Sequence, residues 1–279
     1  MTTVKDIRKI LKRGQDNIIC QKYNYFSGNY SVNQSVSNFG VNWENMPGYK
    51  NQKRSLVAID CIVFGFDGQN LKILLIHRGL EPEKGKWSLM GGFVQPDESA
   101  DEAANRILTG LTGLEGVYLE QLHTFSNPER DPIERTFSIA YFALIDINCY
   151  QTQLNDQYHA EWFLLSEMPN LIFDHSQMVS MARKKLKYKA AMHPLLFELL
   201  PVKFTIPLLQ SLFEDVFETT FDKGNFSRKI VSTGMLLKQK DKDKLGSKKG
   251  AFYYQLDKKH YRKNFHKILT LVPNPNGLL

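Results

Sequence analysis

Hydrophobic and polar positions follow two different periods in the middle of the chain, which indicates strands mixed with helices. Apolar runs at 55–66 and 71–78 flank an Asp-Gly turn, and this order predicts a hairpin of two strands. Residues 98–111 instead repeat apolar positions every three or four residues, as an amphipathic helix does. Further elements are predicted as strands at 88–94, 117–125, 135–145 and 160–165 and as a helix at 176–189. Mixed strands around a central helix predict an α+β fold.

The C-terminal segment has a different rhythm. Two helices are predicted at 206–217 and 222–236, and the second helix would turn Phe226, Ile230 and Val231 inward. The segment after them predicts a strand, a lysine-rich loop and a second strand. Two helices followed by a basic hairpin are typical of a winged helix-turn-helix domain.

These patterns divide the chain into three parts. Residues 1–52 are rich in Asn, Ser, Tyr and Gly and show no sustained period, so we expect an irregular N-terminal extension. Residues 53–192 contain the α+β pattern and form the first predicted domain. Residues 193–279 form the second, because the helix-turn-helix pattern follows a connector bracketed by Pro194 and Pro201.

The composition agrees with a folded, water-soluble protein. Hydrophobic residues make up 42% and charged residues 23% of the chain, which is ordinary for a globular domain. No apolar run approaches the roughly 18 residues of a membrane span, and the N-terminus is too charged for a signal peptide, so we expect a cytoplasmic protein. Cys20, Cys61 and Cys149 are too widely spaced to indicate a disulfide framework or a CxxC metal site.

Positive charge is concentrated towards the C-terminus. The chain has a formal net charge of +7, and the segment from Pro201 to Leu279 carries 15 Lys and Arg against 7 Asp and Glu. The whole excess therefore belongs to the predicted helix-turn-helix domain. Such asymmetry favours a polyanion partner, although a solvated basic face would give the same composition.

One stretch of the chain carries a chemical motif. GGFVQPDESADEAANRILTGLTGL, at 91–114, resembles the Nudix box, whose pattern is G-x5-E-x7-R-E-U-x-E-E-x-G-U with U apolar. The positions that fit are Gly92, Glu98, Arg106, Leu108, Gly113 and Leu114. Three positions at which the family has glutamate hold Ile107, Gly110 and Leu111 instead.

These three losses remove the metal site that the resemblance would otherwise imply. Positions i, i+3 and i+4 share one face of a helix, and in the family's enzymes that face holds Mg²⁺ against a diphosphate. Mg²⁺ requires hard oxygen ligands, which Ile, Gly and Leu lack. We therefore expect no metal, no cofactor and no Nudix hydrolysis. The competing hypothesis is a hydrolase that uses other carboxylates, and the nearby candidates are Glu98, Asp101, Glu102 and Glu115.

A degenerate Nudix box followed by a winged helix resembles the Nudix-related transcriptional regulators, and NFSRK is similar to part of their C-terminal helices. IDCIVFGF, WSLMGGFVQPDES, RDPIERTFSIAYFALI and DKLGSKKGA resemble the arabinose-responsive members, so the resemblance covers roughly residues 55–263. It implies a Nudix-like α/β/α sandwich with a mixed sheet, followed by a winged helix. It also implies a homodimeric regulator that binds a double-stranded DNA operator and senses a sugar such as L-arabinose. The alternatives are a regulator that senses ADP-ribose and a hydrolase of nucleoside diphosphate-linked substrates.

Six residues are candidates for effector binding. Asp60 stands in an apolar strand, where a carboxylate is costly unless it is paired or hydrogen-bonded. Sugar hydroxyls or an arginine would satisfy it, and Arg78 and Arg135 are candidate partners of Asp60 or of a ligand. Trp87 is placed either to stack on a sugar face or to serve as a core aromatic. The set is completed by Gly91 and Gly92. Two adjacent glycines permit a tight strand-to-helix turn, whether for packing or for a pocket.

The second C-terminal helix carries the candidate base-reading residues. Asn225, Arg228 and Lys229 fall near its N-terminal half, the part of a recognition helix that reaches base edges. Arginine reads guanine and asparagine reads adenine through two hydrogen bonds each. The candidate phosphate contacts are the wing lysines Lys238, Lys240, Lys248 and Lys249. Such contacts give affinity and salt dependence rather than sequence preference.

Overall fold

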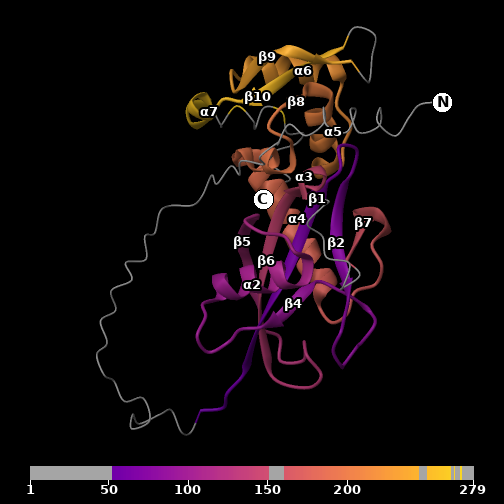
Figure 1. Ribbon diagram of the computed structural model, residues 1–279, viewed down its shortest axis with the longest axis vertical. Helices are drawn as coiled ribbons and strands as arrows, with labels where there is room; N and C mark the ends of the chain where they lie inside the picture. Colours follow the sequence, from indigo (N-terminus) through magenta and orange to yellow (C-terminus); the bar gives the residue numbers. More distant parts are fainter. Residues whose placement is uncertain (1–51, 151–159, 245–249, 265–266, 268–270, 272–279) are drawn as a thin grey trace, which may run out of the picture.

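The computed structural model describes residues 52–150, 160–244, 250–264, 267 and 271 (Figure 1). The strands of the first part are β1 (Leu56–Phe66), β2 (Leu71–His77), β3 (Trp87–Ser88), β4 (Met90–Phe93), β5 (Tyr118–Phe125), β6 (Thr136–Asp146) and β7 (Glu161–Leu164). Its helical elements are α2 (Ala100–Thr112), α3 (Ile147–Tyr150), η3 (Leu165–Glu167), α4 (His175–Met192) and η4 (Pro194–Leu199). The second part contains β8 (Phe204–Thr205), α5 (Ile206–Phe217), α6 (Lys223–Ser232), β9 (Leu236–Asp243), β10 (Ala251–Leu256) and α7 (Lys258–Asn264).

Strand β1 lies at the centre of a mixed sheet. It runs parallel to β6, with Leu56 opposite Thr136 and Phe66 opposite Asp146, and antiparallel to β2 and β4. The order across the sheet is β3-β2-β1-β6-β5, while β4 also pairs with β1 and β7 with β2. Because both faces of this sheet are covered, β1 is a nearly continuous apolar run rather than an alternating one.

The two faces of the sheet carry separate cores. Ile59, Cys61 and Val63 of β1 share one buried cluster with the apolar side of α2. Ile62 and Phe64 belong to a second cluster, which includes the apolar side of α4. Successive residues of a strand point to opposite faces, so α2 and α4 cover opposite sides of the sheet (Figure 1). The predicted α/β/α sandwich with a mixed sheet is confirmed.

Capping residues in the sequence set both ends of helix α2. The Ser99 hydroxyl accepts a hydrogen bond from the backbone N–H of Glu102, and the Glu102 carboxylate accepts one from the backbone N–H of Ser99. This capping box satisfies two N–H groups that the first helical turn leaves unpaired. Gly113 ends the helix with a φ of 76°, a left-handed conformation that glycine adopts without strain. Glu102, one of the alternative carboxylates, is therefore engaged in capping.

The second part is a winged helix, with a small sheet in the order β8-β10-β9. The buried side chains of Phe226 and Ile230 fix α6, and the Phe226 ring lies 5.5 Å from that of Phe213 on α5. The predicted inward position of Val231 is wrong, because this side chain is 46% exposed. It follows Ile230 by one residue and so lies about 100° around the helix from the buried stripe. Strand β9 also continues to Asp243, into the segment predicted as a loop.

Polar contacts join the two parts. The Asp215 carboxylate on α5 accepts a hydrogen bond from the backbone N–H of Leu71 at the start of β2, at 2.6 Å. Glu218, directly after α5, pairs with Arg183 and with the Nζ of Lys187, which lies at 2.6 Å. Arg183 lies at the middle of α4 and Lys187 one turn further on, so this helix spans from the sheet to the winged helix (Figure 1).

The predicted domain limits at 53–192 and 193–279 stay predictions. The extension predicted at 1–52 lies outside the described residues, except for residue 52. Within the part of the chain that the structure describes, no helix is both long enough and apolar enough to cross a membrane.

Candidate functional site

The surviving polar residues of the box hold the loop between β4 and α2. The guanidinium of Arg106 donates from Nε to one Glu98 carboxylate oxygen at 2.8 Å and from Nη2 to the other at 2.5 Å. Nη2 also donates to the backbone carbonyl of Phe93 at 3.0 Å. The hydrogen bonds from Arg106 lower the pKa of Glu98 to about 2. Glu98 is thus a structural anion that Arg106 already satisfies.

The face that holds metal in the enzymes is apolar or bare in this chain. Ile107 is buried, and a β-carbon added to Gly92 would lie 3.0 Å from its side chain. Leu111 packs against the same apolar cluster, whereas Gly110 is exposed and has no side chain. Among the described residues, no group of three or more His, Cys, Asp or Glu side chains is placed to hold a metal ion. The residues at this face therefore do not fit Mg²⁺.

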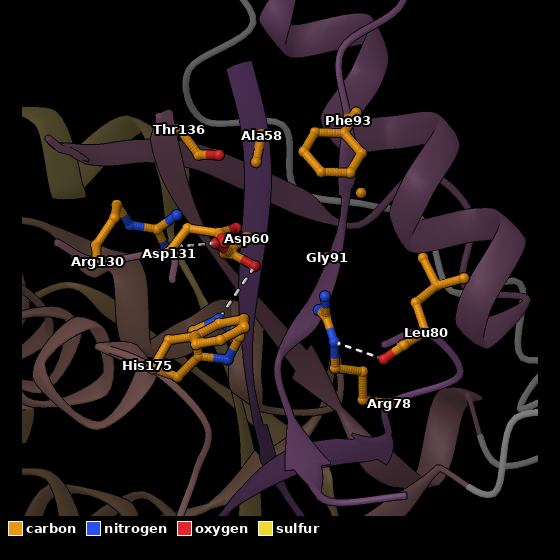
Figure 2. Close-up of a pocket in the computed structure, with 12 residues that line it drawn as sticks. Ala58, Asp60, Arg78, Leu80, Gly91, Phe93, Arg130, Asp131, Thr136 and His175 are labelled. Carbon is orange, nitrogen blue, oxygen red and sulfur yellow. Dashed lines mark hydrogen bonds and ion pairs between the residues drawn. The ribbon is translucent and has the colours of Figure 1, made fainter. Parts of the chain in front are cut away.

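A pocket opens where the box glycines meet the N-terminal end of α4 (Figure 2). It is lined by Ala58, Asp60, Arg78, Leu80, Gly91, Gly92, Phe93, Arg130, Asp131, Thr136, Phe173 and His175. Its enclosed space is about 70 Å³, which is smaller than the roughly 300 Å³ or more of a typical ligand site. A larger ligand would extend across the mouth, where Leu80 is 65% and Phe93 is 46% exposed.

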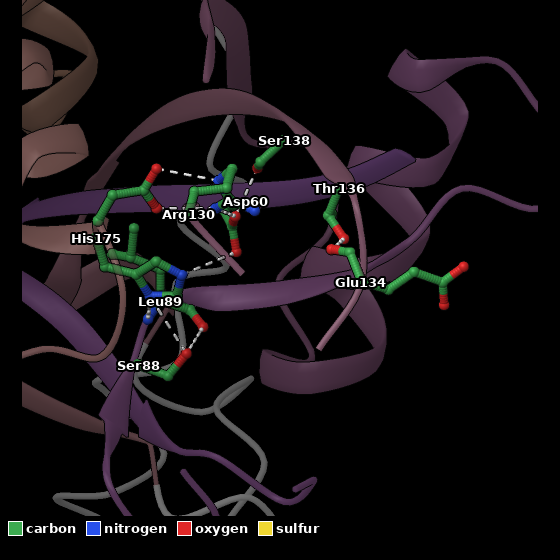
Figure 3. Close-up of polar contacts among 9 residues, drawn as sticks. Asp60, Ser88, Leu89, Arg130, Glu134, Thr136, Ser138 and His175 are labelled. Carbon is green, nitrogen blue, oxygen red and sulfur yellow. Dashed lines mark hydrogen bonds and ion pairs between the residues drawn. The ribbon is translucent and has the colours of Figure 1, made fainter. Parts of the chain in front are cut away.

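Asp60 lies at the centre of the pocket floor and is almost completely buried. The hydroxyl of Ser138 on β6 donates to its Oδ2 at 2.5 Å. The Nη2 of Arg130 lies 3.5 Å from the same oxygen, and the Nε2 of His175 lies 3.5 Å from Oδ1 (Figure 3). The protein itself therefore supplies the partners that a buried carboxylate requires. None of these partners is Arg78 or Arg135, the two arginines considered from the sequence.

Arg130 is committed to two carboxylates. Its Nε and Nη2 donate to the two oxygens of Asp174 at 3.0 and 2.9 Å, in a fork that suits a guanidinium, and Nη2 also faces Asp60. The Arg130 side chain is 3% exposed. Removing one partner of such a buried ion pair strongly destabilises the folded protein, because the remaining charge is left without a partner. This ion pair network fixes the shape of the pocket floor.

The tautomer of His175 follows from its neighbours. Nδ1 accepts a hydrogen bond from the backbone N–H of Leu89 at 3.2 Å, so the proton of the neutral ring is on Nε2, which faces Asp60 (Figure 3). Burial lowers the pKa of His175, and the opposing charges of Asp60 and Asp174 only partly offset this effect. The neutral ring thus presents its Nε2–H towards Asp60.

The structure brings together four of the six predicted effector residues. Asp60, Arg78, Gly91 and Gly92 line the pocket, whereas the other two do not. The Trp87 ring instead packs on other aromatics, with centroids 3.8 Å from His77 and 4.8 Å from Phe163. The Arg135 guanidinium lies 4.2 Å from the ring centroid of Phe137 and donates to the backbone carbonyl of Asn127. Sequence reasoning missed Arg130, Phe173 and His175.

The winged helix presents the predicted DNA-facing residues at its surface. Asn225, Arg228 and Lys229 are exposed on α6, and the Nη2 of Arg228 donates to the Oδ1 of Asn225 at 3.1 Å. Lys238 and Lys240 are exposed on β9, and the ammonium of Lys238 lies 3.8 Å from the ring centroid of Phe252. The remaining two predicted contacts, Lys248 and Lys249, lie outside the described residues.

The fold and the site define a class of protein: a Nudix domain without the carboxylates of its metal-binding helix face, joined to a winged helix. Residues 54–182 match the family described as the NUDIX domain, and residues 196–256 match the NrtR DNA-binding winged helix domain. The chain is 33% identical over 218 residues to the "ADPR responsive transcriptional repressor NtrR" of Acinetobacter baylyi, spanning 77% of this chain and 87% of that relative. It therefore belongs to the NrtR family of Nudix-domain transcriptional regulators.

Two further comparisons concern DNA and ADP-ribose. The crystal structure of Shewanella oneidensis NrtR complexed with a 27mer DNA is similar, with a TM-score of 0.62 and 29% identity over 74% of this chain and 95% of that chain. An ADP-ribose pyrophosphatase of Methanocaldococcus jannaschii is 36% identical over 124 residues, 44% of this chain and 70% of that relative. Because the names of the relatives point to ADP-ribose, the expected kinship with arabinose-responsive regulators is not supported.

Proposed function

We propose that this chain is a transcriptional repressor that binds operator DNA through its winged helix and releases the DNA when ADP-ribose occupies the Nudix pocket. One observation carries the proposal. The Nudix fold keeps a pocket with a fixed polar floor around Asp60, has lost the carboxylates for metal at Ile107, Gly110 and Leu111, and continues into a basic winged helix. The relative from Acinetobacter baylyi, named as a repressor responsive to ADP-ribose, supports this combination.

ADP-ribose suits the pocket better than a free sugar does. The floor offers carboxylate oxygens of Asp60 and Asp131, which accept hydrogen bonds from ribose hydroxyls. The exposed apolar side chains of Leu80 and Phe93 at the mouth provide a surface for the adenine base. A pentose alone would contact the floor and leave this apolar mouth uncovered.

On the DNA side, α6 acts as the recognition helix. Asn225, Arg228 and Lys229 contact base edges in the major groove, and the exposed lysines Lys238 and Lys240 contact phosphates. The chain acts as a homodimer, because two copies of such a domain bind two half-sites of an operator. Lys248 and Lys249 are proposed as further phosphate contacts on sequence grounds alone.

We further propose that ADP-ribose is bound and not cleaved. The Methanocaldococcus jannaschii relative is a pyrophosphatase by name, but the present chain lacks the carboxylates that would hold the metal. Glu98 is engaged by Arg106, and Glu102 caps α2. Incubation with ADP-ribose and Mg²⁺ should release no AMP. Turnover that disappears in Glu98→Gln would support the hydrolase alternative.

The central test measures DNA binding with and without each effector. Duplexes that the full-length protein selects from a random-sequence pool serve as operator candidates, and binding is followed by fluorescence anisotropy. We expect ADP-ribose to weaken binding by about 5- to 150-fold, the usual range of coupling between two sites, and L-arabinose to have no effect. Release by L-arabinose alone would restore the sugar hypothesis. Failure to select any duplex would overturn the assignment of the winged helix as a DNA-binding domain.

A further inference from the structure

Arg78 is held in place at the edge of the pocket by its own loop. Its Nε–H is shared between the backbone carbonyl oxygens of Leu80 at 2.9 Å and Pro82 at 2.7 Å. The guanidinium also lies over the ring of Phe173, with 5.1 Å between its central carbon and the ring centroid. These contacts use the Nε–H and one face of the guanidinium, and so they orient it without neutralising its charge.

The two terminal nitrogens of Arg78 remain available to a ligand. Among the described residues, neither has a hydrogen-bond or ion-pair partner. The charge of Arg78 reaches the pocket floor, since it contributes to the lowered pKa of His175. Figure 2 shows Arg78 and Arg130 on opposite sides of the pocket.

The other charged groups that line the pocket do not suit a phosphate. Arg130 already donates two hydrogen bonds to the carboxylate of Asp174 and also faces Asp60, so two carboxylates offset its charge. The carboxylates of Asp60 and Asp131 repel a phosphate and instead suit hydroxyl donors. Among the described lining residues, Arg78 is therefore the cation that no carboxylate offsets.

We propose that Arg78 supplies the counter-charge for the diphosphate of ADP-ribose, in the role that a divalent metal has in the Nudix hydrolases. The inference rests on the proposed ADP-ribose site. A guanidinium with two free nitrogens presents parallel N–H donors to phosphate oxygens, and it needs no carboxylates on α2 to hold it. The acidic floor then faces the hydroxyl-bearing ribose, and the diphosphate lies towards Arg78. Ligand binding by this chain is consequently independent of metal.

The test is calorimetry of full-length protein with ADP-ribose, in Mg²⁺ and in EDTA. We expect the same Kd in both buffers and a loss of about 10- to 100-fold in affinity in Arg78→Ala, the value of a hydrogen bond to a charged group. The ADP-ribose affinity of Arg78→Lys should lie between those of the wild type and Arg78→Ala, because lysine keeps the positive charge but cannot donate two parallel hydrogen bonds. Adenosine, which lacks the diphosphate, should bind the wild type and Arg78→Ala equally.

Arg135→Ala is a matched control. Arg135 also stacks on a phenylalanine and donates to a backbone carbonyl, but it lies outside the lining of the pocket. We expect this variant to bind ADP-ribose as the wild type does, and thermal melts verify that each variant is folded. Unchanged affinity in folded Arg78→Ala, or wild-type binding that is lost in EDTA, would overturn the role of Arg78 while leaving the ADP-ribose site intact. No binding by the wild type in either buffer would overturn both.

Discussion

A β-carbon built on Gly91 would lie 2.6 Å from the Oδ1 of Asp60, a separation that real β-carbons essentially never have. Asp60 has no room to retreat, because Ser138 and Arg130 contact its other oxygen. We therefore expect Gly91→Ala to lower the free energy of unfolding by about 1–3 kcal/mol, the usual cost of overpacking. The same variant should bind ADP-ribose more weakly. Urea unfolding and calorimetry measure the two effects, and wild-type values in both would show that the floor is more adaptable than this geometry indicates.

Gly110→Ala should have the opposite effect on stability. Gly110 lies in the last turn of α2, and a β-carbon there would meet no atom within 4 Å. Replacing a helical glycine with alanine gains about 0.5–1 kcal/mol through lower backbone entropy in the unfolded chain. We expect a rise of about 1–2 °C in Tm for a chain of this length, with no change in ADP-ribose affinity. A lower Tm would indicate that this position needs glycine for a reason that the structure of α2 does not show.

Much of the fold follows from local pattern. The apolar runs at 55–66 and 71–78 became β1 and β2, because a strand buried on both faces leaves a continuous apolar run. The amphipathic repeat at 98–111 became α2, because burial of one stripe leaves a periodic trace. Val231 was misplaced because an apolar residue next to Ile230 looks buried in sequence, although one step around a helix takes it to solvent. The wing strand was underestimated because lysines that alternate with other polar residues carry no apolar signal.

The candidate site was only partly predictable. Asp60 stood out because a carboxylate in an apolar strand requires a partner, and the box motif marked Gly91 and Gly92. The partners, Arg130 and His175, lie 70 and 115 positions further along the chain, and only the folding of β6 and α4 around β1 brings them together. The available signal was the arginine-aspartate pair in RDPIERT, whose role no local pattern could assign.

Two substitutions distinguish base reading from phosphate contact. Arg228 lies exposed on α6, and Lys240 lies exposed on the wing strand β9. Arg228→Ala should weaken binding to the selected operator by about 1–3 kcal/mol while changing non-specific binding much less. Lys240→Ala should weaken both kinds of binding and lower the salt slope by about 1. Anisotropy titrations over a range of salt concentrations measure both quantities, and negligible effects of both changes would argue against this surface as the DNA interface.

Glu218 connects the winged helix to the helix that closes the effector pocket. Its carboxylate pairs with Arg183 and Lys187 on α4, whose first residue is His175 in the pocket floor. We expect Glu218→Gln to cost less than about 1 kcal/mol of stability, as for exposed ion pairs. It should nevertheless reduce the ratio of operator affinities without and with ADP-ribose. Anisotropy measures this ratio, and an unchanged ratio would show that the effector signal reaches the winged helix by another route.

Asp241→Asn is the control for this effect. Asp241 lies on β9 and pairs with Lys203 at 3.5 Å, so this ion pair belongs to the winged-helix side and does not touch α4. The substitution removes one carboxylate of the same charge while leaving the contacts of Glu218 intact. We expect it to leave the ratio of operator affinities unchanged.

Glu198 predicts a pH dependence of stability at the connector between the two parts. Burial raises the pKa of this carboxyl from 4.5 to about 8, and the charge of Lys258 only partly opposes the shift. Its Oε1 is buried and has no hydrogen-bond partner among the described residues. Between about pH 4.5 and 8 the folded chain holds a proton that the unfolded chain has released, so stability falls as the pH rises through this range and levels off above it.

Glu198→Gln should remove this contribution, because the amide is neutral at every pH and has nearly the same shape. The variant should therefore be more stable than the wild type at pH 8 and nearly equal to it at pH 5. Urea unfolding from pH 5 to 9 measures both proteins, and the difference between the two curves isolates Glu198 from the other titrating groups. Glu129→Gln, at an exposed loop position, is the matched control and should show no such difference. A pH-independent difference for Glu198→Gln would mean that the carboxyl ionises in the folded protein as readily as in the unfolded chain.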